Sequence, residues 1–235
     1  MGTRDAVLGS VIRAAGGLVL PVRCAGCGRA GEPWCPRCHE QSRRPAPDAG
    51  RPCPVPLWAA TTFDGPVRAA VTAAKDGGRS DVRPVLAALL ATALGRALAE
   101  DERLRAARHG GVGVLAVPVP TARGARRRRG EDPLAVLAAS AVRSVDPGSM
   151  RVLGALRHTR AVRDQARLGA AARAANLAGA LEVRPAAAGS VRGRCCVVLD
   201  DVVTTGATVA EAARALRRAG AAHVVAVAVA RTPRV

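Results

Sequence analysis

The chain is poor in aromatic residues and has a single lysine, and each scarcity excludes a kind of site. Its only aromatic side chains are Trp34, Trp58 and Phe63. Proteins that bind single-stranded nucleic acid usually stack bases on aromatic side chains, so we do not expect binding of that kind. The one lysine is Lys75, which follows Ala74. A Walker A phosphate loop is therefore excluded, because it requires a Gly-Lys pair before its Ser or Thr.

The chain also lacks a long uncharged apolar run. Its longest candidate, residues 84–95, is bounded by Arg83 and Arg96 and is too short to span a membrane. The apolar residues 14–22 are followed by Arg23 rather than by the small residues of a signal cleavage site. These absences predict a cytoplasmic protein with no membrane span. In such a chain, seven cysteines indicate metal ligands before disulfides.

Charge is strongly unbalanced. The 235 residues carry a formal net charge of +18, nearly all of it from arginine. This excess predicts attraction to polyanions such as nucleic acid, phosphate esters and pyrophosphate. The alternative for any one arginine is a solvated surface residue, and the abundance of alanine, valine, glycine and arginine is typical of a base-composition bias.

The most informative segment is residues 197–209, with the sequence VVLDDVVTTGATV. The apolar residues 195–199 predict a strand buried on both faces, with Asp200 and Asp201 at its tip. Adjacent carboxylates repel unless a ligand separates them, and ribose hydroxyls or Mg²⁺ would do so. In open α/β sheets, ligands bind at the carboxyl ends of strands.

A hydroxyl- and glycine-rich loop follows the two acids. Gly206 permits the unusual dihedral angles with which the loop can turn several backbone N–H groups toward one point. A predicted helix over residues 210–219 adds its positive N-terminal end, so a phosphate monoester would fit there. The alternative is a plain strand–turn–helix connection whose threonines cap the helix. The phosphate-binding candidates are Thr204, Thr205, Gly206, Ala207 and Thr208.

Four cysteines near the start form two Cys-x2-Cys pairs seven residues apart: Cys24, Cys27, Cys35 and Cys38. Two such pairs can direct four thiolates at one ion, which indicates a structural Zn²⁺ site. So small a segment cannot bury a core, and the ion would supply its folding energy. The alternatives are a redox pair or a degenerate ribbon that no longer binds metal. Cys195 and Cys196 are expected to pack as small hydrophobic residues.

The remaining pattern alternates strands with helices and predicts an α/β fold. After the strand at residues 112–119 comes a basic loop that contains Arg123, arginines 126–129 and Gly130, and then a helix over residues 134–145. If this strand neighbours the strand at 195–199, the basic loop faces the candidate phosphate-binding residues 204–208 and could neutralise pyrophosphate. The alternative is a nucleic-acid-binding or solvated basic patch. Other predicted elements are strands at 59–63, 179–183 and 223–230, helices at 67–74, 86–98 and 168–177, and a mobile basic loop at 156–165.

Residues 197–209 resemble the phosphoribosyl pyrophosphate motif of type I phosphoribosyltransferases. With the four-cysteine module, the chain resembles the ComF/GntX family, which is associated with competence for DNA uptake. The resemblance to this family extends to three more groups of residues: Phe63-Asp64-Gly65 with Lys75, Val117-Pro118-Val119-Pro120 with Arg123 and Arg129-Gly130, and Thr159-Arg160 with Gln165, Arg173 and Asn176. The chain departs from the family at Glu131-Asp132-Pro133, where Phe-Asn-Gln is common.

The resemblance implies a type I phosphoribosyltransferase fold, a mostly parallel sheet flanked by helices, with a small N-terminal zinc-ribbon-like module. The expected divisions are 1–44 for an N-terminal helix and the module, 45–58 for a Pro-rich linker, and 59–235 for the phosphoribosyltransferase-like domain.

The resemblance also implies a function: binding of phosphoribosyl pyrophosphate with Mg²⁺ and transfer of phosphoribose to an acceptor in nucleotide metabolism. Residues 204–208 would hold the 5-phosphate, and Asp200 and Asp201 the ribose hydroxyls and hydrated Mg²⁺. The resemblance also implies that pyrophosphate is bound by Lys75, Arg123 and Arg157. The alternative is a non-catalytic accessory protein of DNA uptake, whose pocket senses a ligand and whose basic surface meets DNA or protein partners. The acceptor and the oligomeric state stay open.

Overall fold

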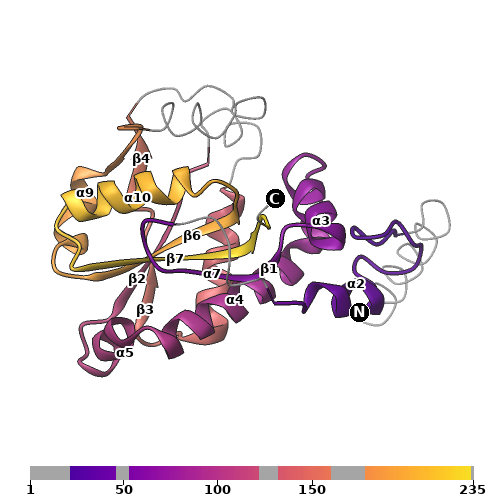
Figure 1. The fold of residues 1–235 in the computed structure, drawn as a ribbon, viewed down its shortest axis with the longest axis horizontal. Helices are drawn as coiled ribbons and strands as arrows, with labels where there is room; N and C mark the ends of the chain where they lie inside the picture. The colour runs from indigo at the N-terminus through magenta and orange to yellow at the C-terminus, as the bar shows by residue number, and fades with distance from the viewer. Residues whose placement is uncertain (1–21, 46–52, 122–131, 160–177, 234–235) are drawn as a thin grey trace, which may run out of the picture.

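The computed structural model describes residues 22–45, 53–121, 132–159 and 178–233, and its centre is a parallel sheet (Figure 1). Every neighbouring pair of strands in this sheet is parallel. The carboxyl ends of all its strands therefore meet at one edge. In sheet order the strands are β1 (Leu57–Thr62), β7 (His223–Arg231), β6 (Cys195–Val203), β2 (Val114–Pro118) and β3 (Met150–Val152).

Helices cover both faces of this sheet (Figure 1). Alternate residues of β6 point to opposite faces: Val197 and Leu199 join one core cluster, and Cys196 and Val198 join the other. The first face is covered by α3 (Gly65–Lys75), η1 (Ser80–Val82), α4 (Arg83–Glu100), α5 (Glu102–His109) and α7 (Pro133–Val145). The second is covered by α9 (Pro185–Val191) and α10 (Ala207–Arg218). This arrangement confirms the predicted fold class.

Strand β6 is longer than the sequence predicts. It continues past Leu199 to Val203, because pairing with β7 persists through Asp200↔Ala228 and Val202↔Ala230. The sequence placed Asp200 and Asp201 at the tip of the strand, but the strand continues for two residues beyond them, which corrects the prediction. Helix α10 correspondingly begins at Ala207, three residues before the predicted start.

The predicted basic loop at residues 156–165 is wrong at its start. Leu156–His158 forms strand β4, which pairs antiparallel with β5 (Leu181–Val183). Leu156 is buried while Arg157 is exposed, so one apolar residue anchors an otherwise polar segment. Several expectations lie outside the described residues: the N-terminal helix, Arg123, arginines 126–129, Gln165, Arg173, Asn176 and the helix at 168–177.

Residues Ser80–Glu100 form a helical stretch that is long and apolar enough to cross a membrane by length and composition. Half of the apolar window is buried inside the fold. The buried face of α4 repeats with helical spacing and packs in the first core cluster, which is the pattern of a core helix. Its buried residues are Leu86, Ala87, Leu90, Ala93, Leu94, Ala97 and Leu98.

Candidate functional site

The loop after β6 and the start of α10 enclose a small polar cavity. Gly206 adopts φ +77° at the N-cap position, a left-handed conformation that a side chain would strain. Because Gly206 has no side chain, it cannot cap the N–H groups at the start of α10. The first turn of α10 lines the cavity directly. The cavity has a volume of about 30 Å³ and is lined by Asp200 and residues 202–209. Backbone N–H groups at a helix N-terminus favour an anion.

A residue outside the motif, Thr232, supports this loop, and the sequence analysis did not assign it to the site. The Thr232 hydroxyl donates to the carbonyl of Thr204 at 3.1 Å, and the Thr232 amide donates to the carbonyl of Val203 at 3.0 Å. The Cys53 sulfur lies near the loop, because a Cβ added to Gly206 would be 3.9 Å from it. These positions depend on the tertiary fold, so no local sequence signal could have revealed them.

The two acids have different environments. Asp200 is 8% exposed, and its carboxylate accepts a hydrogen bond from the Asp201 amide at 2.8 Å. Burial, reinforced by the charge of Asp201, raises the pKa of Asp200 to about 8, although Lys75 opposes the shift. Asp201 is more accessible, with 21% of its side chain exposed. The pair thus combines a buried acid, whose pKa is raised, with a more accessible one.

Lys75 meets Asp201 across 126 residues of sequence. Its Nζ lies 2.8 Å from Oδ1 and 2.7 Å from Oδ2 of Asp201. Partial burial alone would lower the pKa of Lys75, but the charge and hydrogen bond of Asp201 outweigh it and raise the pKa above its ordinary value. An ammonium group has three N–H donors, so Lys75 can hold Asp201 and still donate to a ligand. Helix α3 thus brings two of the predicted site residues together.

The donor set fits a hydrated Mg²⁺. This ion retains several waters and is usually held by one or two carboxylates together with substrate phosphates. Asp200 lines the cavity, and Asp201, the next residue of β6, supplies a second carboxyl group. They could therefore hold such an ion.

Strand β2 does neighbour β6, as the basic-loop prediction required. Asp132 ties the two ends of that loop together, because its carboxylate accepts hydrogen bonds from the Thr121 hydroxyl at 2.8 Å and from the Leu134 amide at 3.1 Å. It thereby caps α7. This gives Asp132 a structural role at one of the positions where the chain departs from the ComF/GntX pattern. Arg123 lies outside the described residues.

Arg157 is paired with Glu182 on the neighbouring strand, 2.5 Å away, and both side chains are substantially exposed. Its guanidinium is therefore held by the β4–β5 hairpin rather than by the loop of residues 204–208. Its predicted role in binding pyrophosphate stays a prediction.

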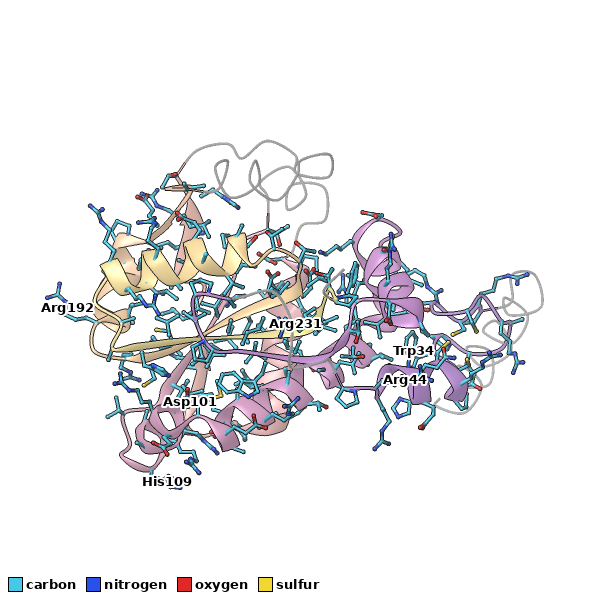
Figure 2. The ribbon with its side chains drawn as sticks, viewed as in Figure 1. Trp34, Arg44, Asp101, His109, Arg192 and Arg231 are labelled. Carbon is cyan, nitrogen blue, oxygen red and sulfur yellow. The ribbon has the colours of Figure 1, made fainter. Side chains whose placement is uncertain are left out.

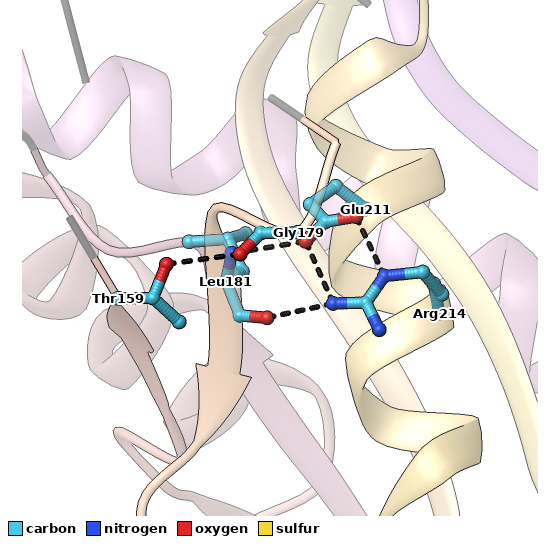
Figure 3. Close-up of polar contacts among 5 residues, drawn as sticks. All are labelled: Thr159, Gly179, Leu181, Glu211 and Arg214. Atoms are coloured by element: carbon cyan, nitrogen blue, oxygen red, sulfur yellow. Dashed lines mark hydrogen bonds and ion pairs between the residues drawn. The ribbon is translucent and has the colours of Figure 1, made fainter. Parts of the chain in front are cut away.

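The hairpin is fastened to α10 by a buried acid (Figure 3). Glu211 is 5% exposed and accepts a hydrogen bond from the Leu181 amide at 2.9 Å. Arg214 bridges the same two residues, since it donates to Glu211 at 2.7 Å and to the Leu181 carbonyl at 2.9 Å. The i,i+3 spacing of Glu211 and Arg214 on a helix is a signal that could have indicated the pair.

The four cysteines of the N-terminal pairs form one cluster. The sulfur atoms of Cys24, Cys27, Cys35 and Cys38 all lie within 4.8 Å of one another. Cys27 and Cys35 have sulfur atoms 3.7 Å apart. Tetrahedral zinc with Zn–S bonds of about 2.3 Å requires S···S separations of about 3.8 Å. The cluster therefore could hold Zn²⁺.

The backbone around this cluster also fits a metal–thiolate knuckle. A bridge between Arg23 and Ala30 closes a tight turn, in which Gly28 adopts φ +76°. The Cys35 amide points at the Cys24 sulfur, 3.4 Å away. Burial raises the pKa of Cys24, but N–H donors of this kind outweigh it and bring the pKa to about 6. The turn therefore favours the thiolate form of Cys24, which is the form that binds metal, while burial and the neighbouring cysteines raise the pKa of Cys38.

Comparison with known proteins agrees with this geometry. Residues 128–234 match the family model described as "Phosphoribosyl transferase domain". A ribose-phosphate pyrophosphokinase of Nitrosomonas europaea is 60% identical over 38 residues, which are 16% of this chain and 12% of that protein. The chain thus aligns with only a small part of that relative. The carboxyl-terminal part of the chain is therefore similar to a phosphoribosyl transferase domain, and it accompanies a four-cysteine cluster.

Proposed function

We propose that the chain binds phosphoribosyl pyrophosphate with Mg²⁺ and transfers the phosphoribosyl group to an acceptor. The observation that carries this proposal is the cavity between Asp200 and the first turn of α10, within the region that matches the phosphoribosyl transferase model. The backbone N–H groups of residues 204–208 hold the 5-phosphate, and the two acids hold the ribose hydroxyls. Binding energy is concentrated where the ligand carries charge.

The chain's own residues also favour the transition state. Positive charge develops on the ribose ring as pyrophosphate departs, and nearby carboxylates stabilise it. Lys75 donates to a departing phosphate oxygen while it remains paired with Asp201. Mg²⁺, when bound, neutralises pyrophosphate charge. Arg123 and Arg157 are the further proposed pyrophosphate contacts.

We also propose membership of the ComF/GntX family and a structural Zn²⁺ in the cysteine cluster. Support comes from the order of parts along the chain, a four-sulfur cluster followed by the phosphoribosyl transferase domain. With four thiolates the ion has no open coordination position, so it would be structural rather than catalytic.

The test is the double variant Asp200→Asn, Asp201→Asn. Asparagine has the shape of a protonated aspartate, so the buried Asp200 site tolerates it and the fold is retained. The Mg²⁺-dependent binding of phosphoribosyl pyrophosphate is expected to be lost. Asp76→Asn, an acid close to Lys75 that holds no part of the proposed ligand, is the matched control. Wild-type binding by the double variant would refute the assignment.

A second candidate is a non-catalytic accessory role in DNA uptake. The observation that favours it is the arginine-rich end of the molecule opposite the cysteine cluster, where Arg192 lies (Figure 2). Arg194 immediately precedes β6, and Arg217 and Arg218 are the last two residues of α10. A hydrogen bond from the Gly193 amide to the Gly220 carbonyl brings these two segments together. Pyrophosphate release with a panel of bases supports the transferase. DNA binding that weakens steeply with salt, without turnover, supports the accessory role.

A further inference from the structure

The four-cysteine module, residues 22–45, packs directly against the helix that carries Lys75. A Cβ on Gly26 would lie 2.7 Å from the Cys38 sulfur and 2.8 Å from Cβ of Pro66. Pro66 is in the first turn of α3. One glycine therefore separates a thiol of the cluster from the start of α3, and the close approach depends on its lack of a side chain.

Further contacts fix the module to the main core. Ala25 and Trp34 pack against the core cluster that contains Val67 and Val71 of α3. At the other end of the module, the buried Thr61 hydroxyl of β1 donates to the Arg44 carbonyl at 2.8 Å. Trp34 and Arg44 lie together at the α2–α3 side of the molecule (Figure 2; α2 is Pro36–Ser42). The module is therefore attached at both ends.

Helix α3 connects this junction to the ligand site. It has 11 residues, so it spans about 16 Å at 1.5 Å per residue. Its first turn touches the module through Pro66, and its last residue is Lys75, which is paired with Asp201. Only Val67, Ala70 and Val71 of α3 are buried, so the helix packs against the main core of the protein through a narrow face. The module supplies a second support.

We infer that the four-cysteine module is a positioning element of the ligand site, because it sets α3 so that Lys75 meets Asp201. The inference extends the proposed function by giving the metal module a role in that same site. A displaced module would move the helix and separate the ammonium group from the carboxylate. The cluster and the phosphate loop are then parts of one site rather than independent units.

The test exploits Lys75 as the chain's only ε-amino group. An amine-acylating ester forms stable amides at Lys75 and at the α-amino terminus, and mass spectrometry measures both rates in the zinc-loaded full chain. In Gly26→Ala the new methyl group cannot fit without shifting Cys38 or Pro66. Lys75 is expected to react about two- to fivefold faster relative to the terminus, the range set by loss of one exposed ion pair.

Two further variants make the result decisive. Thr61→Val removes the hydrogen bond to Arg44 without added bulk, and it is expected to act in the same direction should Gly26→Ala fail to fold. Gly189→Ala is the matched control, because nothing lies within 4 Å of its added Cβ. The inference would be overturned if Lys75 reacted at the wild-type rate in folded Gly26→Ala. If Gly26→Ala does not fold, a wild-type rate in Thr61→Val would overturn it.

A second measurement separates positioning from general stability. Gly26→Ala is expected to weaken binding of phosphoribosyl pyrophosphate with Mg²⁺ in the wild-type background. It should have no further effect in Lys75→Gln, because the module acts through that side chain. Equal losses in both backgrounds would contradict positioning through Lys75. Failure of the wild type to bind would refute the proposed function, while the acylation rates would still decide the inference.

Discussion

Replacement of Glu211 by alanine is expected to release the β4–β5 hairpin from α10. Glu211 accepts hydrogen bonds from the Leu181 amide at 2.9 Å and from two nitrogens of Arg214 at 2.7 and 2.8 Å. In the alanine variant the Leu181 N–H has no acceptor, although Leu181 is only 1% exposed. The hairpin then loses its hydrogen bond to Glu211 and retains the hydrogen bond from Arg214 to the Leu181 carbonyl.

The magnitude follows from burial. An unsatisfied buried N–H costs about 1–3 kcal/mol. Because the Arg214 side chain is 44% exposed, loss of the ion pair adds at most about 1 kcal/mol. Together these give a local destabilisation of about 1–4 kcal/mol, which increases the open population of the hairpin roughly 5- to 800-fold.

Amide hydrogen exchange is the assay, because it reports local opening separately from global unfolding. Faster exchange is expected at β5, with unchanged exchange at β7. Glu211→Gln, which retains an acceptor for Leu181, is expected to show a smaller effect. Arg217→Ala, an exposed change on the same helix, is the control. Wild-type exchange at β5 in Glu211→Ala would refute the reasoning.

Three further results are expected. Gly206→Ala forces a side chain into φ +77°, so it should lower the free energy of unfolding by about 1–2 kcal/mol and weaken ligand binding. An unchanged denaturant midpoint would contradict a left-handed conformation at this position. Asp146→Ala removes an acid that accepts hydrogen bonds from Ser149 and Arg108, which outweigh burial and lower its pKa. The cost of about 1–3 kcal/mol at pH 7 should begin to fall as the pH drops below about 4, and its charge-dependent part should be lost below the lowered pKa of Asp146. Parallel stability–pH curves for the variant and the wild type would contradict this. Metal analysis should find one Zn²⁺ per chain, and chelation should expose four reactive thiols; metal-free protein with an unchanged fold would contradict a structural ion.

The sequence predicted the buried strands and the acid-rich segment because these signals are local. The apolar runs before Asp200 and before Pro118 could be recognised without knowledge of the fold, and both form strands of one parallel sheet. The spacing of the cysteine pairs predicted a four-sulfur cluster, which the structure confirms. The end of β6 was not predicted, because it depends on pairing with β7, which extends the strand through Asp200 and Asp201.

The contacts that organise the site could not be read from local patterns. Lys75 and Asp201 are 126 residues apart, and their pairing depends on how α3 docks. Strand β4 was missed because three residues, of which only Leu156 is buried, carry no periodic signal. The roles of Thr232 and Asp132 likewise arise from tertiary hydrogen bonds.

The most direct test of the account is a calorimetric titration of the zinc-loaded full chain with phosphoribosyl pyrophosphate, with and without Mg²⁺. The account predicts saturable binding that requires Mg²⁺ and is lost in the Asp200→Asn, Asp201→Asn variant. The absence of binding by folded, zinc-loaded protein at any Mg²⁺ concentration would contradict it.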